Sequence, residues 1–253
     1  MNKNLNLKKW KKYKNIITTD SLWISNIKKD DSKFIIPKRK ILSKIKNDNT
    51  FHGVFIPEIP YQFIKRFTKK NDIIWDCFAG SGTTKRVADV LGRLTINTDL
   101  NSKKNYIIKA DARYYNPNIL INHKIDLIIM HPPYFNIVKY SNDKNDGSNQ
   151  ETLKGFLIWF EEVCKNVTKY LKEEGFLILI CGNIYLDQEE KTLGVWCKDI
   201  ICKYNFKCKA QIIKDYGETK GGNRNYNLNY YRQLNGNYNN FYGDNIFILQ
   251  KGN

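Results

Sequence analysis

Short apolar runs alternate with amphipathic helical patterns from Asn71 onward. The runs predict strands in DIIWDCF (72–78), RLTINTD (93–99), NYIIKAD (105–111), KIDLIIMH (124–131) and EGFLILICG (174–182). Helical patterns lie between them at 83–91, just after Asp99 and at 117–122. This alternation is typical of a parallel sheet with crossover helices, so the chain is expected to form an α/β, doubly wound, Rossmann-like fold.

The strongest helical pattern covers Thr152 to Lys172, where apolar residues recur every three or four positions and charges occupy the opposite face. A further helix is expected at 192–204, followed by strands at 206–217 and 244–251. If these two strands pair, the mainly parallel sheet ends in an antiparallel hairpin. Their connection, 217–243, is long for a compact domain, and such a loop is usually functional or disordered.

Length and charge refine this picture. A chain of 253 residues can bury one good core, so we expect one catalytic domain at 51–253 preceded by a basic extension at 1–50. The net charge of +17 is concentrated in 2–14 and 36–46, which favours a polyanion such as nucleic acid over an anionic membrane surface. Solvated surface charge without a partner is the alternative.

Six cysteines without a CxxC pair, several of them inside apolar runs, indicate a reduced, cytoplasmic protein. No apolar run approaches the roughly 20 residues that span a bilayer, so no membrane association is expected. The histidines show no metal-ligand spacing, and no metal is predicted.

A glycine-rich turn joins the first predicted strand to its helix, and it places Asp76, Phe78, Gly80, Gly82 and Thr83 in sequence. Glycines let the backbone approach a ligand closely, and the helix beginning near Thr83 offers unpaired N–H groups. The turn reads GxGTTK, which matches neither the dinucleotide fingerprint nor a phosphate loop. Since Asp76 would repel a pyrophosphate, a cationic ligand is favoured.

Two more acids, Asp99 and Asp111, follow later strands. Taken singly, each acid is a common turn or cap residue. Three strand ends that present acids to one crevice suit a nucleoside with a positive centre, and Asp99 has the spacing of an acid that reaches a ribose hydroxyl. S-adenosylmethionine is such a ligand and is the predicted cofactor.

The pair DCFAGSGTT and HPPY resembles the class I S-adenosylmethionine-dependent DNA methyltransferases that modify adenine N6 or cytosine N4. The segment FHGVFIPEIPYQFIKRF looks like the family's segment over the methionine end of the cofactor, with His52, Gly53 and Pro57 at corresponding places. The resemblance implies that Phe78, Gly80 and Gly82 cradle the cofactor, that Asp99 holds its ribose, and that Asp111 contacts its adenine. It covers roughly residues 50–185 and, weakly, the end of the chain.

The predicted catalytic residues are His131, Pro132, Pro133 and Tyr134. An exocyclic amine is a poor nucleophile, and two acceptors that draw on its hydrogens can localise its lone pair for in-line attack. The prolines fix the direction of the Pro132 carbonyl, residue 131 supplies the second acceptor, and Tyr134 offers a face to an unstacked base. The family motif has Asp, Asn or Ser at position 131, so His131 is a departure, and it can accept only as neutral imidazole.

The target base stays open, with adenine favoured on family base rate alone. Because no separate recognition domain is evident, target contacts are expected from the first fifty residues, from the loop at 135–150 or from 217–243. In the last segment, cations and rings suited to phosphate contact and stacking are Arg224, Tyr226, Tyr230, Tyr231 and Arg232. A mobile polar loop is the alternative there.

The predicted partner is DNA, with RNA not excluded, and a homodimer or a separate specificity or restriction subunit is compatible with the small size of the recognition segments. Rival functions are an RNA base or protein glutamine methyltransferase of the same fold, or a catalytically inactive relative that binds nucleic acid.

Overall fold

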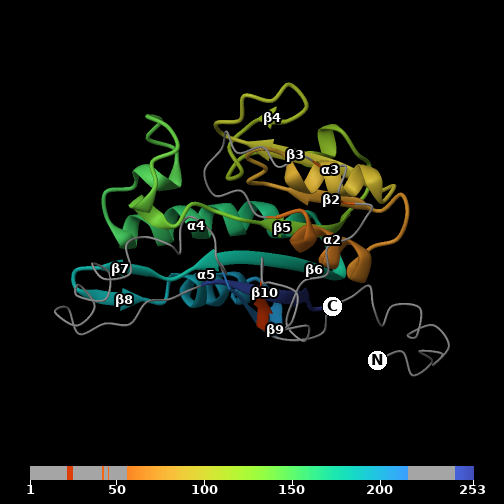
Figure 1. The fold of residues 1–253 in the computed structure, drawn as a ribbon. Helices are drawn as coiled ribbons and strands as arrows, with labels where there is room; N and C mark the ends of the chain where they lie inside the picture. Colours follow the sequence, from red (N-terminus) through yellow and green to blue (C-terminus); the bar gives the residue numbers. More distant parts are fainter. Residues whose placement is uncertain (1–21, 25–41, 43–44, 46–55, 216–242) are drawn as a thin grey trace.

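The computed structural model describes residues 22–24, 42, 45, 56–215 and 243–253. In order across the main sheet, its strands are β1 (Leu22–Ile24), β9 (Phe206–Asp215), β10 (Gly243–Lys251), β6 (Leu171–Gly182), β5 (Ile125–Met130), β2 (Ile73–Asp76), β3 (Leu94–Asp99) and β4 (Ile108–Lys109). Figure 1 shows this order from β9 near the bottom of the view to β4 at the top. The order reverses direction at β2, as a doubly wound sheet requires.

Strand directions confirm the predicted fold class. The pairs β2 with β3, β2 with β5, β3 with β4, and β5 with β6 are all parallel. Strand β10 is antiparallel to both β6 and β9, which is the antiparallel hairpin expected at the end of the sheet. Strand β1 lies inside the segment predicted as a basic extension, and it pairs in parallel with β9.

Helices cover both faces of the sheet: α2 (Glu58–Phe67), α3 (Thr83–Val90), α4 (Leu153–Val167) and α5 (Leu193–Cys202). Trp75 and Ile128 belong to one buried cluster with α4 and α5, whereas their neighbours Ile74 and Leu127 belong to a second cluster with α2 and α3. Successive strand residues point to opposite faces, so a continuous apolar run supplies both cores at once.

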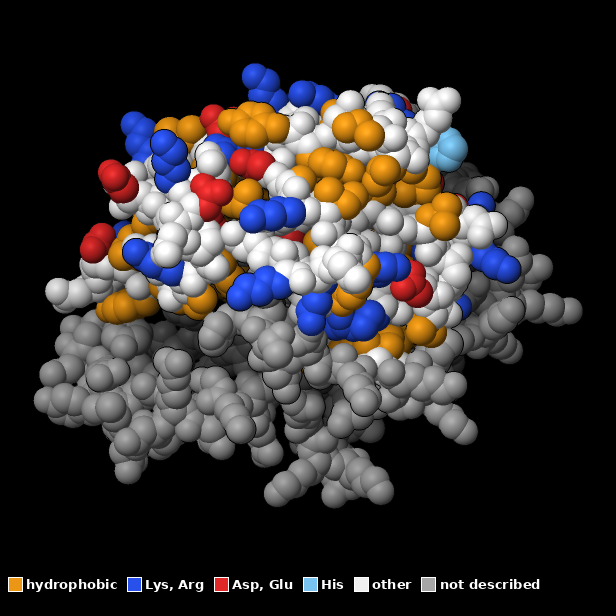
Figure 2. Space-filling view, turned by 90° about the horizontal axis from the view of Figure 1, so that it is seen from above, with side chains coloured by type: hydrophobic (Ala, Val, Ile, Leu, Met, Phe, Trp, Pro, Cys, Tyr) orange, Lys and Arg blue, Asp and Glu red, His pale blue; other side chains and the backbone are white. Residues whose placement is uncertain are grey.

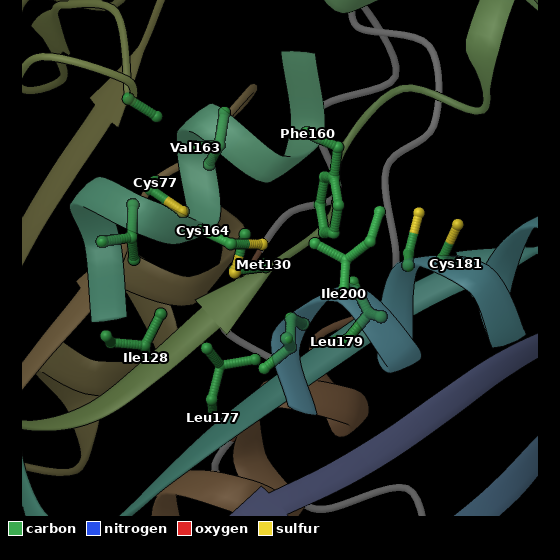
Figure 3. Close-up of a cluster of buried hydrophobic side chains, with 14 of the residues drawn as sticks. Cys77, Ile128, Met130, Phe160, Val163, Cys164, Leu177, Leu179, Cys181 and Ile200 are labelled. Atoms are coloured by element: carbon green, nitrogen blue, oxygen red, sulfur yellow. The ribbon is translucent and has the colours of Figure 1, made fainter. Parts of the chain in front are cut away.

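Figure 3 shows the first core, where Phe160 and Cys164 of α4 lie above Met130 of β5 and Leu179 of β6. Fully burying a large apolar side chain stabilises a fold by about 1.5–3 kcal/mol. Burial raises the pKa of the thiols of Cys164 and Cys181 well above the ordinary value. These cysteines therefore act as small apolar side chains, as predicted, and all six cysteines are free thiols.

The helix predicted to reach Lys172 ends earlier. Helix α4 stops at Val167, a 3-10 turn follows at Thr168–Tyr170, and β6 already begins at Leu171, which pairs with Ile125. Apolar spacing could not reveal this end because Tyr170 and Leu171 contact the same core as the helix. The Thr168 hydroxyl donates to the Cys164 carbonyl at 2.7 Å and helps to close the last turn.

The short helix predicted just after Asp99 is wrong. Residues 100–107 form bends and turns, and the Asn101 N–H donates to Asp99 Oδ1 at 2.8 Å, a local bond that competes with helix formation. The predicted strand at 105–111 shrinks to two residues in β4. The sequence also gave no warning of the hairpin of β7 (Ile184–Leu186) and β8 (Glu189–Lys191), whose turn uses Asp187 and Gln188 at positive φ instead of the usual Asn-Gly.

Candidate active site

The glycine turn lies at the carboxyl end of β2. Gly80 and Gly82 both have positive φ, 49° and 78°, and Gly82 is the N-cap residue that precedes α3. A Cβ on Gly82 would lie 2.8 Å from Cε2 of Tyr106, so the position has room for no side chain. The Gly80 N–H donates to Asp99 Oδ2 at 2.8 Å, which ties the turn to the end of β3.

Asp76 and Asp99 place two buried acids under this turn, 1% and 8% exposed. Burial raises the pKa of Asp76 to about 7, and the negative charge of Asp99 acts in the same direction, while the Phe78 N–H donates to Asp76 and opposes it. Burial also raises the pKa of Asp99, against the hydrogen bonds from Asn101 and Gly80. Ionising both acids together is costly, and a nearby cation stabilises their charged forms.

Asp111 lies two residues beyond β4, and its carboxylate is held by Arg113. The guanidinium donates to Asp111 from Nη2 at 2.7 Å and from Nε at 3.1 Å, and it also reaches Glu162 at 3.2 Å and Asn145 at 2.9 Å. The hydrogen bond with Asp111 raises the pKa of Arg113. The Asp111 carboxylate is therefore already paired with a cation of the chain.

The HPPY residues extend from the carboxyl end of β5, directly beside the glycine turn. Asp76 pairs with Ile129, so His131 follows only two residues after the point where β2 ends. Pro132 is buried, whereas His131, Pro133 and Tyr134 are half-buried and reachable from outside. The sheet thus brings together the two motifs that lie some fifty residues apart in the sequence.

Phe135 anchors the far end of this motif. It is 2% exposed, its ring meets that of Phe156 edge to face at 6.0 Å, and its backbone has φ of 50°. A bulky residue at positive φ costs about 1–3 kcal/mol and persists only where the surroundings enforce it. The core contact therefore fixes the direction in which the chain leaves Tyr134.

The loop that follows is fastened next to the acids by Asp146. Its carboxylate, 5% exposed, accepts hydrogen bonds from Asn101 at 2.8 Å, from Ser141 at 2.9 Å and from the Ser148 hydroxyl at 2.8 Å. Asn101 belongs to the turn that follows Asp99. The predicted target-recognition loop is thereby linked to the predicted cofactor side of the site.

His131 contacts Tyr134 and, through it, Asp244. His131 Nε2 lies 3.1 Å from the Tyr134 hydroxyl, which donates to Asp244 Oδ1 at 2.7 Å. Burial lowers the pKa of His131, Asp244 opposes this shift and Lys214 adds to it. The net direction favours the neutral imidazole, which is the form that can accept a hydrogen bond.

Asp244 and Gly182 are site residues that the sequence analysis missed. They face each other in the pairing of β10 with β6, and a Cβ on Gly182 would lie 2.8 Å from Cε2 of Tyr134. Both residues had been assigned only to strand ends. The two residues are 62 positions apart in the sequence, so only the pairing of β10 with β6 could have identified them as neighbours.

Several predicted residues fall outside the described part of the chain: His52, Gly53, Arg224, Tyr226, Tyr230, Tyr231 and Arg232. Pro57 precedes α2, and the Phe78 ring packs at 6.0 Å from that of Trp159 in α4. In the described ranges, no cluster of three or more His, Cys, Asp or Glu side chains could hold a metal ion. None of the helices that the structure describes is long and apolar enough to cross a bilayer.

The doubly wound, mainly parallel sheet that ends in an antiparallel hairpin is the fold of class I S-adenosylmethionine-dependent methyltransferases. The family model described as DNA methylase matches residues 2–110 and 125–245, and the chain belongs to that family. Membership confirms the predicted family and the predicted cofactor, S-adenosylmethionine. No curated protein matches the chain.

Solved structures with a similar fold share little sequence. TrmN from Thermus thermophilus is 16% identical with a TM-score of 0.50, over 79% of this chain and 50% of that one. A methyltransferase from Pyrococcus furiosus is 15% identical with a TM-score of 0.47, over 83% and 89%. Phospholethanolamine N-methyltransferase 2 from Haemonchus contortus, in complex with phosphomonomethylethanolamine and S-adenosylhomocysteine, is 13% identical with a TM-score of 0.44, over 77% and 52%. The chain thus spans half the length of the TrmN chain.

Proposed function

We propose that the protein transfers a methyl group from S-adenosylmethionine to an exocyclic amino group of a base in DNA, with adenine N6 favoured over cytosine N4. The observation that carries the proposal is the register of β2 against β5, which sets HPPY beside the glycine turn. Family membership supports DNA as the substrate. The preference for adenine still rests on family base rate.

The residues around the turn fit the proposed cofactor. A sulfonium cation offsets the cost of ionising Asp76, whose raised pKa shows how poorly the protein alone accommodates that charge. The Asp99 carboxylate accepts from Gly80 and Asn101, and an ionised carboxylate retains further lone pairs for ribose hydroxyls. The bound cofactor supplies an electrophilic methyl group.

The HPPY residues would act on the target base. The Pro132 carbonyl and the neutral His131 ring accept the two amine hydrogens, and the Tyr134 ring packs against the base. The contact of Phe135 with Phe156 and the close approach of Gly182 to the Tyr134 ring restrict the conformation of the motif. Rigidity matters because a displacement of about 1 Å can cost about 100-fold in rate.

Target contacts are proposed for the loop after HPPY and for the residues from Arg224 to Arg232. The loop lines an open, polar hollow of about 440 Å³, and the residues that border it are Asn136, Lys139, Asn142, Lys144, Ser148, Asn149, Gln150 and Glu151. Its lysines suit phosphates and its amides suit base edges. Figure 2 shows Lys and Arg side chains scattered over the face seen from above, consistent with a surface that attracts a polyanion.

RNA is the second candidate substrate, since a net charge of +17 attracts either nucleic acid. Radiolabelled cofactor with matched single- and double-stranded DNA and RNA oligonucleotides separates the two. Label in DNA supports the proposal, label in RNA alone replaces it with the RNA alternative, and cofactor binding without any transfer supports the inactive relative. Single-molecule sequencing of DNA from cells that express the protein then gives base and context.

Cellular context also remains a proposal. A cytoplasmic location agrees with six free thiols. We also propose a role in restriction and modification, as a homodimer or together with a separate specificity or restriction subunit. Purifying the protein from its own cells and measuring the mass of the assembly tests these proposals.

A further inference from the structure

The turn at 99–102, which follows β3, is hydrogen-bonded to the glycine turn. Asp99 Oδ2 accepts from the Gly80 N–H at 2.8 Å, and the Ser102 hydroxyl donates to the Gly80 carbonyl at 3.0 Å. The Asn101 N–H donates to Asp99 Oδ1 at 2.8 Å, so a backbone N–H holds each oxygen of this carboxylate. Since Gly80 uses both its N–H and its carbonyl, the glycine turn fixes the place of the 99–102 turn.

The side chain of Asn101 binds the loop that follows HPPY. Its Nδ2 donates to Asp146 Oδ2 at 2.8 Å, and the same oxygen accepts from the Ser141 hydroxyl at 2.9 Å. The other oxygen, Oδ1, accepts from the N–H and the hydroxyl of Ser148 at 2.9 and 2.8 Å. Bonds to a carboxylate are among the stronger hydrogen bonds in proteins. One buried carboxylate therefore connects the 99–102 turn to two separate points of the loop.

Tyr140 gives a second indication that this loop lies close to Asp99. Burial raises the pKa of the Tyr140 phenol, and the negative charges of Asp146 and Asp99 raise it further. The Tyr140 N–H donates to the Ser148 hydroxyl at 3.2 Å, and Ser148 borders the polar hollow. The part of the loop that faces the hollow is thus the part that is bound to the carboxylate of Asp146.

A ligand that binds Asp99 would act on this connection. Burial raises the pKa of Asp99, and a ribose hydroxyl that donates to the carboxylate favours its charged form and restricts the turn. A restricted turn loses less conformational freedom when Asn101 binds Asp146. Loops that bind ligands usually belong to the least stable parts of a fold, so a small bias of this kind changes how often the loop is held in place.

We propose that Asn101 is a positioning residue that couples the two binding sites: cofactor bound at Asp99 orders the 99–102 turn, and Asn101 transmits this order to the target loop through Asp146. Bound cofactor then raises the affinity for nucleic acid, and nucleic acid raises the affinity for the cofactor by the same factor. The role of the loop in target binding rests on the proposed function. The effect of the cofactor on the loop can be measured without any nucleic acid.

Asn101→Ala and Ser141→Ala form a matched pair of variants. Each removes one hydrogen bond to Asp146 Oδ2, but only Asn101 belongs to the turn on the cofactor side. Alanine at 101 keeps the N–H that donates to Asp99. Ser141→Ala also removes the acceptor of the Asp143 N–H, so it disturbs the loop at least as much. A difference between the two variants therefore reports the link and not a general loosening of the loop.

Hydrogen exchange of the full chain, followed by mass spectrometry with and without saturating S-adenosylhomocysteine, reports the loop directly. We expect the ligand to slow exchange of the amides at 140–149 at least about fivefold in the unaltered chain and in Ser141→Ala, but less than about twofold in Asn101→Ala. Calorimetry verifies that each variant binds the ligand. Equal slowing in Asn101→Ala, no slowing in the unaltered chain, or loss of the effect in both variants overturns the role of Asn101.

Nucleic-acid affinity tests the coupling itself. Anisotropy gives dissociation constants, with and without S-adenosylhomocysteine, for the oligonucleotide that the labelling experiment identifies as a substrate. We expect the ligand to tighten binding at least about fivefold in the unaltered chain and in Ser141→Ala, but less than about twofold in Asn101→Ala. A gain that persists in Asn101→Ala overturns the coupling. If no oligonucleotide is methylated, the proposed function fails, but hydrogen exchange still decides whether Asn101 transmits cofactor binding to the loop.

Discussion

If His131 accepts a hydrogen of the target amine, as proposed, its protonation state sets a lower pH limit for methyl transfer. Only the neutral ring accepts a hydrogen bond, and burial lowers the pKa of His131 below its ordinary value of 6.5. We therefore expect kcat to be constant from pH 8 down to 6.5 and to fall at lower pH. The measurement is kcat against pH between 5 and 8.

Two controls accompany that profile. His131→Asn has no titrating group at this position, so its activity should lack the acid limb. Asp244→Asn removes a negative charge that raises the His131 pKa, so its acid limb should move to lower pH. An acid limb in His131→Asn identical to that of the unaltered protein would exclude the ring as the titrating acceptor.

We expect the buried Asp76 carboxylate to lower stability and, as a proposed cofactor contact, to raise cofactor affinity. Its pKa is about 7 in the folded protein and 3.8 as the reference value, so between these pH values the folded state binds more protons than the unfolded state. Stability consequently falls as pH rises through this window, by on the order of 4 kcal/mol. Asp76→Asn removes the buried charge and should be more stable than the unaltered protein at pH 8, but not at pH 3.5.

The same substitution, Asp76→Asn, should weaken binding of the cofactor. Without the carboxylate, the sulfonium loses a buried counter-charge, and we expect affinity at pH 8 to fall at least about tenfold. Urea unfolding at both pH values measures stability, and calorimetry measures affinity. An unchanged dissociation constant in Asp76→Asn would remove Asp76 from the cofactor site.

Among the elements, the turn before α3 can be tested with a matched pair of glycines. Gly82 and Gly92 flank the same helix, with φ of 78° and 68°. Alanine at either position should cost about 1–2 kcal/mol of stability because of its left-handed backbone. At Gly92 the new Cβ meets only the Lys70 side chain at 3.5 Å, whereas at Gly82 it meets Tyr106 at 2.8 Å.

We therefore expect Gly82→Ala to lower cofactor affinity at least about tenfold, and Gly92→Ala to leave it within about twofold. Calorimetry and thermal unfolding give the two quantities. Equal affinities for the two variants would mean that the turn does not approach the cofactor.

The loop after HPPY provides a second test of an element. Asp146→Ala removes the acceptor shared by Asn101, Ser141 and Ser148, and leaving such buried polar groups unsatisfied costs about 1–3 kcal/mol. We expect KM for the nucleic acid to rise several-fold and limited proteolysis within 135–151 to accelerate. Asp143→Ala, at an exposed position of the same loop, is the control. Equal effects in both variants would contradict a special role for Asp146.

Sequence reasoning correctly predicted the features that leave a local pattern in the sequence. Strand runs such as 73–76 and 125–130 and the glycines at 80 and 82 are local signals, and they located the turn and the strand ends correctly. Sequence reasoning failed for features that are determined by tertiary contacts. The end of α4 and the partnership of Asp244 with Tyr134 depend on residues distant in sequence, which no periodicity reports.

For the molecule as a whole, the excess of 42 basic over 25 acidic residues predicts that affinity for nucleic acid depends on the salt concentration. Each phosphate neutralised by Lys or Arg releases counterions, and a protein with six to ten such contacts loses about 10³–10⁵ in affinity between 50 and 200 mM salt. We expect affinity for a duplex of unrelated sequence to fall at least about 100-fold over that range. Fluorescence anisotropy with labelled DNA measures it.

Cofactor affinity is the internal control, because the acids proposed to face the cofactor, Asp76 and Asp99, are buried and are screened far less than surface charges. It should change less than about threefold over the same range of salt. A duplex affinity that is equally insensitive to salt would mean that the positive charge is solvated and does not contact phosphates. Target binding would then depend on base contacts from the predicted recognition segments, which are the first fifty residues, the loop at 135–150 and the segment at 217–243.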